Sequence, residues 1–232
     1  QKKLDNYIKD KFEVNNFGQG LFNSTDVLIR FLTSTIYTKP DIIVLYIGYN
    51  DIRSYLTNNF QTDHSHSRKN LNLSKFQKFL NLIAYDFKLN FLNYILSKLA
   101  IYNIKETLTA EISNGEFHLE NNPNKGLEVF YQNIESLISI CKNKKIRLIM
   151  SSFCHYLYSD VKNNNLHKKF NELVKKENEI LKYLAKKNDI EFVDNDNLIE
   201  KNENLFVDTI HFSKEGMSTL AENFFKKIIQ KN

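Results

Sequence analysis

The strongest pattern in the chain is an unbroken apolar run over residues 42–47, rich in β-branched side chains and followed at once by a glycine and small polar residues. A half-exposed strand would alternate between apolar and polar positions, so the run predicts a central strand of a parallel sheet with helices on both faces. Ligands of such sheets bind beyond the carboxyl ends of the strands. The residues at this end are Gly48, Tyr49, Asn50 and Asp51.

Two of these residues have chemistry that suits a site. Gly48 lets the backbone turn or approach a ligand closely, and Asn50 offers an uncharged amide donor that can stabilise a developing oxyanion. A structural interpretation fits as well, in which Gly48 turns the chain while Asn50 and Asp51 cap the next segment. The stretch alone does not decide between the two.

Helical and strand patterns alternate along most of the chain. Helical spacing before residue 12, a strand at 12–17, a Gly-x-Gly loop at 18–20 and an N-cap at 23–26 form one unit of this kind. Later helices are predicted at 127–141, at 166–187 and after Ser213, and later strands at 146–150 and 190–193. This alternation predicts a doubly wound, mostly parallel α/β sheet.

The alternation stops between residues 55 and 125. A long helical stripe at 76–99 predicts a helical insertion or lid, and packing within the insertion is favoured over contact with a substrate. His64 and His66 lie in the polar loop before this stripe. Two histidines two positions apart, with no further ligand nearby, are more typical of a solvated surface than of a metal site.

Length and composition bound the rest. A chain of 232 residues suits one α/β domain with one core. The net charge of +5 comes from lysines spread over helical surface, which argues against a nucleic-acid partner. Two cysteines cannot form a disulfide framework, and Cys141 is predicted to pack as a small apolar residue.

No apolar run is long enough to span a bilayer, and the residues at Gln1 form neither a signal peptide nor an initiator start. The chain looks like part of a longer polypeptide, whose upstream residues could target or anchor it. Localisation, membrane association and oligomeric state therefore stay open.

Asp208 and His211 are the second informative pair. They lie three positions apart, before a helix that Ser213 can cap, so the carboxylate can hold one imidazole nitrogen while the other acts as a general base. A bare Asp-x-x-His more often combines a helix-capping carboxylate with a surface histidine. Here the pair follows the last strand, so it can face the same sheet edge as Asn50 and Gly20.

Three segments, at 16–20, 47–51 and 208–216, resemble the second, third and fifth sequence blocks of the SGNH (GDSL-type) hydrolases. The resemblance implies a flavodoxin-like α/β fold and an ester-hydrolysing site without a cofactor or metal. It makes His211 the general base, Asp208 its orienting carboxylate and Asn50 the side-chain oxyanion donor. A backbone donor would come from Gly20 or its neighbour Leu21, and Gly20 is the residue assigned.

The first block of that family, a strand ending in Gly-Asp-Ser with the nucleophilic serine, has no match in the chain. Ser151 and Ser152 fall at the loop after the family's fourth strand and are not assigned this role. The simplest account places the strand and its serine upstream of Gln1, and a degenerate, inactive relative is the alternative.

Function is therefore expected to be serine-dependent hydrolysis of a small-molecule or glycan ester, with carbohydrate O-acyl groups and lipids as candidate substrates. Gly48, Tyr49 and Asp51 are expected to contribute to binding. A non-catalytic glycan- or acyl-binding module of the same fold is an alternative. Acyl transfer to a saccharide is another, because it would use the same residues.

Overall fold

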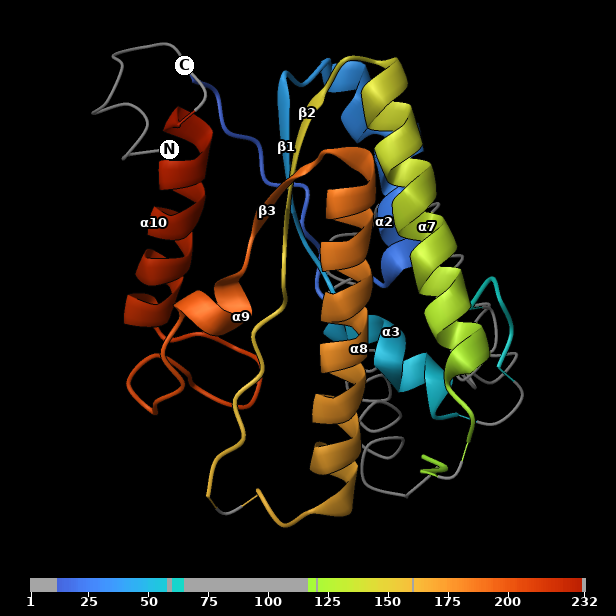
Figure 1. The fold of residues 1–232 in the computed structure, drawn as a ribbon, viewed down its shortest axis with the longest axis vertical. Coiled ribbons are helices and arrows are strands. Elements are labelled where there is room, and N and C mark those ends of the chain that lie inside the picture. Colours follow the sequence, from blue (N-terminus) through green and yellow to red (C-terminus); the bar gives the residue numbers. More distant parts are fainter. Residues whose placement is uncertain (1–11, 58–59, 65–116, 120, 160, 231–232) are drawn as a thin grey trace, which may run out of the picture. The chain divides into compact units, whose positions relative to one another are not determined.

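The computed structural model describes residues 12–57, 60–64, 117–119, 121–159 and 161–230 (Figure 1). The chain divides into two compact units, Gln1–Tyr55 with Pro123–Asn232, and Leu56–Asn122. The predicted helix before residue 12 and the stripe at 76–99 lie outside the described residues. The three strands described below belong to the first unit.

The sheet consists of β1 (Ile42–Tyr46), β2 (Arg147–Ser151) and β3 (Glu191–Val193), all parallel and in the order β1-β2-β3. Val44 on β1 pairs with Ile149 on β2, which pairs in turn with Glu191 on β3. Parallel neighbours require long crossovers, and helices supply them between these strands. The predicted parallel α/β sheet flanked by helices is confirmed.

The described helices of this unit are α2 (Ser24–Thr33), the short 3-10 helix η1 (Thr35–Thr38), α3 (Tyr49–Tyr55), α7 (Asn124–Asn143), α8 (Asn165–Asn188), α9 (Asn195–Leu198) and α10 (Lys214–Ile229). Four of them, α2, α7, α8 and α10, begin close to the predicted residues, whereas η1, α3 and α9 were not predicted. Asn23 and Asp26 form a capping box at the start of α2, and Ser213 caps α10 by accepting from the Gly216 N–H.

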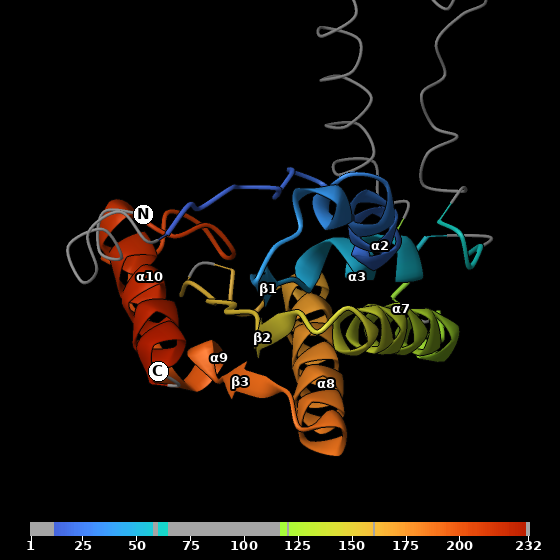
Figure 2. The same ribbon diagram turned by 90° about the horizontal axis from the view of Figure 1, so that it is seen from above.

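Helices cover the sheet from two sides. Figure 2 shows α9 and α10 on one side, with α7 and α8 on the other. The core lies where α7 and α8 pack on the sheet, and its fully buried side chains include Phe130, Ile134, Ile138, Leu148, Ile149, Met150, Leu173, Leu181 and Leu184. Cys141 is also completely buried among them, as predicted for a small apolar residue.

The strand predicted at 12–17 is not formed: residues 12–19 are described but have no regular secondary structure. A strand requires a hydrogen-bonded neighbour, and within the described residues β1 pairs only with β2. β1 therefore lies at the edge of the described sheet instead of its centre. Val44, in the middle of the apolar run, is 41% exposed.

His64 contradicts the prediction of a solvated loop. Its side chain is fully buried, and its ring meets the Phe60 ring edge-on at a centroid distance of 5.5 Å. Burial of a polar-loop residue depends on contacts that a local pattern cannot reveal. His66 lies outside the described residues.

Candidate active site

Asn50 lies in the first turn of α3, immediately beyond the carboxyl end of β1. Its Nδ2 donates a hydrogen bond of 3.0 Å to the carbonyl oxygen of Phe22, at the end of the Gly-x-Gly loop. A side-chain amide nitrogen carries two N–H groups, so one of them can still serve a ligand. The bond thus holds the amide in place against the loop without using up its donor capacity.

The loop before α2 presents free backbone donors. Among the described residues, no group accepts from the N–H of Gly20 or Leu21. Leu21 has a φ of 69°, in the left-handed region that is costly for a side chain of this size, and it is 56% exposed. Gly20, by contrast, has open space where a Cβ would lie. Either N–H can be the backbone donor, and the assignment to Gly20 stays a prediction.

Gly48 is a glycine because a side chain approaches it closely. A Cβ built on it would lie 2.9 Å from the Cβ of Phe153, closer than such atoms ever approach. The next residue, Tyr49, stacks on Phe153 and His155 and packs obliquely on Phe170. Burial raises the pKa of Tyr49 to about 12, although the charge of Arg53 lowers it, so the phenol stays neutral. Tyr49, the residue before Asn50, is therefore packed against three other aromatic rings.

Asp51 is fully buried and faces α2. Its two carboxylate oxygens accept from the backbone N–H of Ser24, at 3.0 and 2.9 Å, and one of them also accepts from the Ser24 hydroxyl. Both oxygens are thus engaged within the protein. The predicted contribution of Asp51 to binding would therefore act through its neighbours.

Asp208 and His211 form a local turn before α10. One oxygen of Asp208 accepts from the backbone N–H groups of Ile210 and His211, at 2.9 and 2.8 Å. The other oxygen lies 2.6 Å from Nδ1 of His211. The His211 side chain is 71% exposed, so its Nε2 is open to a reacting group.

The charge state of Asp208 suits this role. Although partial burial raises it, the pKa of the Asp208 carboxyl lies below its ordinary value because the His211 ring and the two backbone N–H groups donate to it. The carboxylate therefore stays ionised at neutral pH. An ionised Asp208 accepts a hydrogen bond from the Nδ1–H of His211, which keeps the proton on Nδ1 and leaves Nε2 as the proton acceptor.

Ring packing and one backbone hydrogen bond connect the segment that carries Asn50 with the turn that carries Asp208 and His211. Tyr46 on β1 stacks on Phe153 at 5.0 Å and packs on Phe212, the residue after His211, at 6.4 Å. The loop after β2 is tied to the Asp208–His211 turn by the Tyr156 N–H, which donates to the Thr209 carbonyl at 2.9 Å. Asn50 and His211 thus lie on segments that share packing partners.

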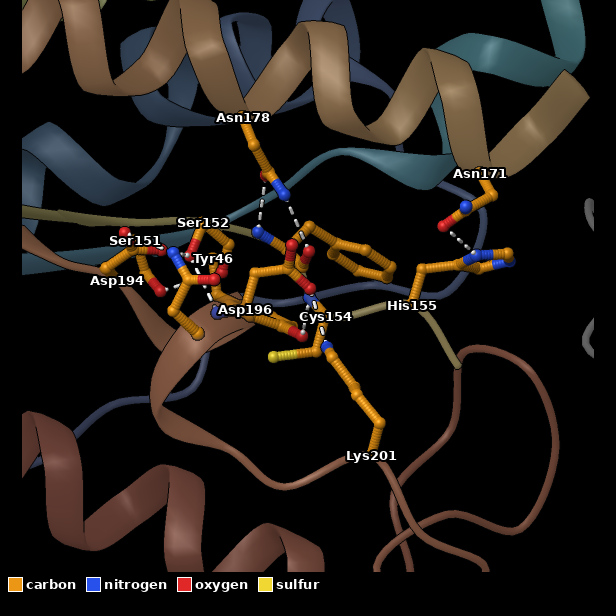
Figure 3. Close-up of polar contacts among 12 residues, drawn as sticks. Tyr46, Ser151, Ser152, Cys154, His155, Asn171, Asn178, Asp194, Asp196 and Lys201 are labelled. Carbon is orange, nitrogen blue, oxygen red and sulfur yellow. Dashed lines mark hydrogen bonds and ion pairs between the residues drawn. The ribbon is translucent and has the colours of Figure 1, made fainter. Parts of the chain in front are cut away.

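Ser151, the last residue of β2, and Ser152, which follows it, have structural roles. The Ser151 hydroxyl accepts from Asn195 and donates to the Ser152 carbonyl, while the Ser152 hydroxyl donates to Asp194 and accepts from the Asp196 N–H (Figure 3). Both serines are fully buried. Neither hydroxyl is available as a nucleophile in this arrangement.

Three residues near the site were not singled out from the sequence. Asn178 on α8 holds the backbone of Phe153 with two hydrogen bonds, at 2.7 and 2.9 Å. The Oδ1 of Asn171 accepts a hydrogen bond of 3.1 Å from Nδ1 of His155 (Figure 3). Glu177 on α8 is fully buried below Gly48. α8 has an ordinary amphipathic pattern in the sequence. The one sign of these roles was that Glu177 and Asn178 lie one turn from apolar positions, on the face of the helix that is buried.

No cluster of three or more His, Cys, Asp or Glu side chains that could hold a metal ion occurs in the described part of the chain. Among the helices described, none is long and apolar enough to cross a membrane.

Comparison with known proteins is consistent with this geometry. Residues 1–218 match the GDSL-like Lipase/Acylhydrolase family. No curated protein matches the chain. An acetyl xylan esterase structure is 14% identical, with 99% of this chain and 88% of that chain covered and a TM-score of 0.56.

Two further structures share the fold. A catalytic mutant of an acetylxylan esterase from Geobacillus stearothermophilus is 16% identical, covering 98% of this chain and 78% of that one with a TM-score of 0.55. A GDSL-like lipase from Bacteroides thetaiotaomicron is 16% identical, covering 90% and 71% with a TM-score of 0.51. At these identities the likeness concerns the fold.

Proposed function

The chain belongs to the GDSL-like lipase/acylhydrolase family, and from this premise we propose that the complete protein is a serine esterase in which His211 is the general base and Asp208 orients it. The observation that carries the proposal is the Asp208–His211 pair. Its 2.6 Å contact occupies Nδ1 of a ring whose other side is open, at the sheet edge that also bears Asn50.

The proposed reaction has two halves. A serine Oγ attacks the ester carbonyl carbon and its proton passes to Nε2 of His211, while Asn50 Nδ2 and a backbone N–H of the 18–21 loop stabilise the oxyanion. The C–O bond to the alcohol then breaks, and the alcohol leaves with the proton from His211. Water attacks the acyl-serine through the same base, which releases the carboxylic acid and regenerates the serine.

The nucleophile must be brought to this edge. No described serine hydroxyl is hydrogen-bonded to the His211 ring. We assign the nucleophile to a further strand, upstream of Gln1, that pairs with the edge of β1 that has no partner strand among the described residues. Support comes from Val44, exposed in the middle of an apolar strand, and from apolar residues of α10 that are only half-buried: Phe224, Phe225, Ile228 and Ile229. An added strand would cover both surfaces.

Short acyl esters of saccharides are the first substrates to test, since two of the structures that share this fold are acetylxylan esterases. The complete polypeptide should hydrolyse p-nitrophenyl acetate and acetylated xylo-oligosaccharides, and His211→Ala should abolish turnover. His167→Ala, which removes a partly exposed histidine of α8, is the matched control and should retain it. Activity that survives His211→Ala, or a complete protein that hydrolyses no ester, would contradict the proposal.

A further inference from the structure

Two buried carboxyl groups lie beneath the turn that carries Asn50, and neither takes part in the proposed reaction. Asp51 and Glu177 are both fully buried. The hydroxyl of Tyr55 donates to one oxygen of Glu177 at 2.8 Å. The other oxygen has no hydrogen-bond partner among the described residues and lies 3.4 Å from the position that a Cβ on Gly48 would take.

Asp51 connects α3 to the start of α2. The Ser24 backbone N–H and hydroxyl that it holds belong to the first residue of α2, directly after the 18–22 loop. Asn133 on α7 supports the same point, donating at 2.9 Å to the hydroxyls of both Ser24 and Thr25. A buried polar network whose members are hydrogen-bonded together fixes one arrangement of the elements that it joins.

Asn50, the neighbour of Asp51, makes a second link to the same segment through its bond to the Phe22 carbonyl. Consecutive residues of α3 therefore hold the loop and the helix that follows it. We propose that Asp51 is a positioning residue: its carboxylate fixes the separation between the loop N–H groups at Gly20 and Leu21 and the amide of Asn50. The inference rests on the proposed esterase function, in which these groups share one oxyanion.

Ionisation matters because a carboxylate can accept the three bonds from Ser24, whereas a protonated acid cannot do so with both oxygens. Burial raises the pKa of Asp51 to about 7, while the Ser24 hydrogen bonds lower it and Asp26 on α2 raises it. In the part of the chain that the structure describes, Tyr55 on α3 and Glu177 on α8 are further titratable groups whose pKa values the charge of Asp51 raises.

The surroundings of Glu177 favour its protonated, neutral form, although the hydrogen bond from Tyr55 acts against this. Burial, and then the charge of Asp51, raise its pKa well above the ordinary value. The neutral Glu177 adds no second negative charge beside Asp51. Glu177→Gln reproduces its size and neutrality and is therefore the matched control for Asp51→Asn.

The test is a double-mutant cycle on the complete protein with one soluble acetyl ester. Asp51→Asn should lower kcat by about 100-fold with a much smaller change in KM, because a displacement of about 1 Å is enough for such a loss. In an Asn50→Ala background the added loss should shrink to about threefold or less, since the amide that Asp51 positions is then absent. Equal losses in both backgrounds would show a merely structural role and overturn the inference.

Hydrogen exchange provides a second readout that does not need activity. Exchange at the amides of residues 20–24 should become faster in Asp51→Asn and stay unchanged in Glu177→Gln. Unchanged exchange in Asp51→Asn would overturn the inference, whether or not the wild-type protein hydrolyses an ester. A wild-type protein that hydrolyses no ester would refute the proposed function separately. If Asp51→Asn does not fold, Ser24→Ala replaces it, because this variant removes one of the three hydrogen bonds to Asp51. Ser24→Ala should show a smaller loss of kcat and a smaller increase in amide exchange. A kcat equal to wild type in Ser24→Ala would overturn the inference.

Discussion

The two halves of the proposed site are held in opposite ways. Around Asn50 the fixing bonds are long-range, since Asp51 and Ser24 are 27 positions apart and Asn50 and Phe22 are 28 apart. Around His211 they are local, because Asp208 reaches residues two and three positions away. Asp51 is fully buried, whereas the side chains of His211 and Asp208 are 71% and 52% exposed.

This difference has a physical consequence. The oxyanion half exists only when α2, α3 and α7 are packed together, so changes there should affect both activity and stability. The His211 half is a turn closed by its own hydrogen bonds on a rigid scaffold, as is common for catalytic loops. Changes there should affect activity alone.

The largest effect is expected for His211→Ala. Loss of the base should lower kcat/KM on the order of 10⁴-fold or more. An exposed side chain with only local contacts contributes little to folding, so the free energy of unfolding should stay within about 0.5 kcal/mol of the wild type. Ester hydrolysis and urea unfolding on the same preparation test both parts, and a strongly destabilised His211→Ala would contradict the comparison.

Asp208→Asn should have the next largest effect. Its remaining oxygen can keep the backbone bonds of the turn, but the new amide group would turn Nδ1 of His211 into an acceptor and move the ring proton to Nε2, the wrong tautomer. The expected loss in kcat is on the order of 100- to 1,000-fold, below the value for a buried aspartate because solvent reaches this pair. Turnover equal to wild type would show that Asp208 serves only as the cap of the turn.

Asn50→Ala should lower kcat by about 100-fold through loss of one oxyanion donor. It should also lower the free energy of unfolding by about 1 kcal/mol, because the Phe22 carbonyl loses its hydrogen bond. The combination of lost turnover and lost stability distinguishes this half from the His211 half. If Asn50→Ala lost turnover but kept the stability of the wild type, the bond from Asn50 to Phe22 would not contribute to holding α2 and α3 together.

The smallest effect on turnover is expected for Glu177→Gln, which should instead change how stability depends on pH. The pKa of Glu177 is raised in the folded protein, so the folded protein still binds a proton at pH values where the unfolded chain, with a glutamate pKa of about 4.3, has released it. The free energy of unfolding therefore falls as the pH rises above about 4.3, by up to about 1.4 kcal/mol per pH unit. Asp51 acts in the same direction up to about pH 7. Glu177→Gln should lose less stability than wild type between pH 5 and pH 8 in urea unfolding, and an equal loss would mean that Glu177 is ionised.

The features that could be predicted from the sequence are those set locally. An unbroken apolar run located β1, and helical periodicity located α7, α8 and α10. Cap residues such as Asn23 and Ser213 located helix starts. The Asp208–His211 contact is local too, but it was expected from the position of the pair before the last helix and from the family resemblance, because the spacing alone favoured a capping aspartate and a surface histidine.

The features that could not be predicted depend on residues far apart in the chain. The segment 12–17 has strand-forming residues, but a strand exists only beside a partner. In the sequence Glu177 is one more charged position on a Lys- and Glu-rich helix. Its burial depends on a contact with Tyr55, which lies 122 positions away in the chain. His64 was misassigned for the same reason.

In the proposed reaction His211 activates a serine supplied to the edge of β1 that has no partner strand in the described part of the chain. Reaction of the complete protein with a fluorophosphonate, followed by mass spectrometry of its peptides, tests this activation most directly. The account predicts one labelled serine, located upstream of Gln1, with labelling that is strongly slowed in His211→Ala and unchanged in His167→Ala. A label on any serine within residues 1–232, or labelling at the wild-type rate in His211→Ala, would contradict it.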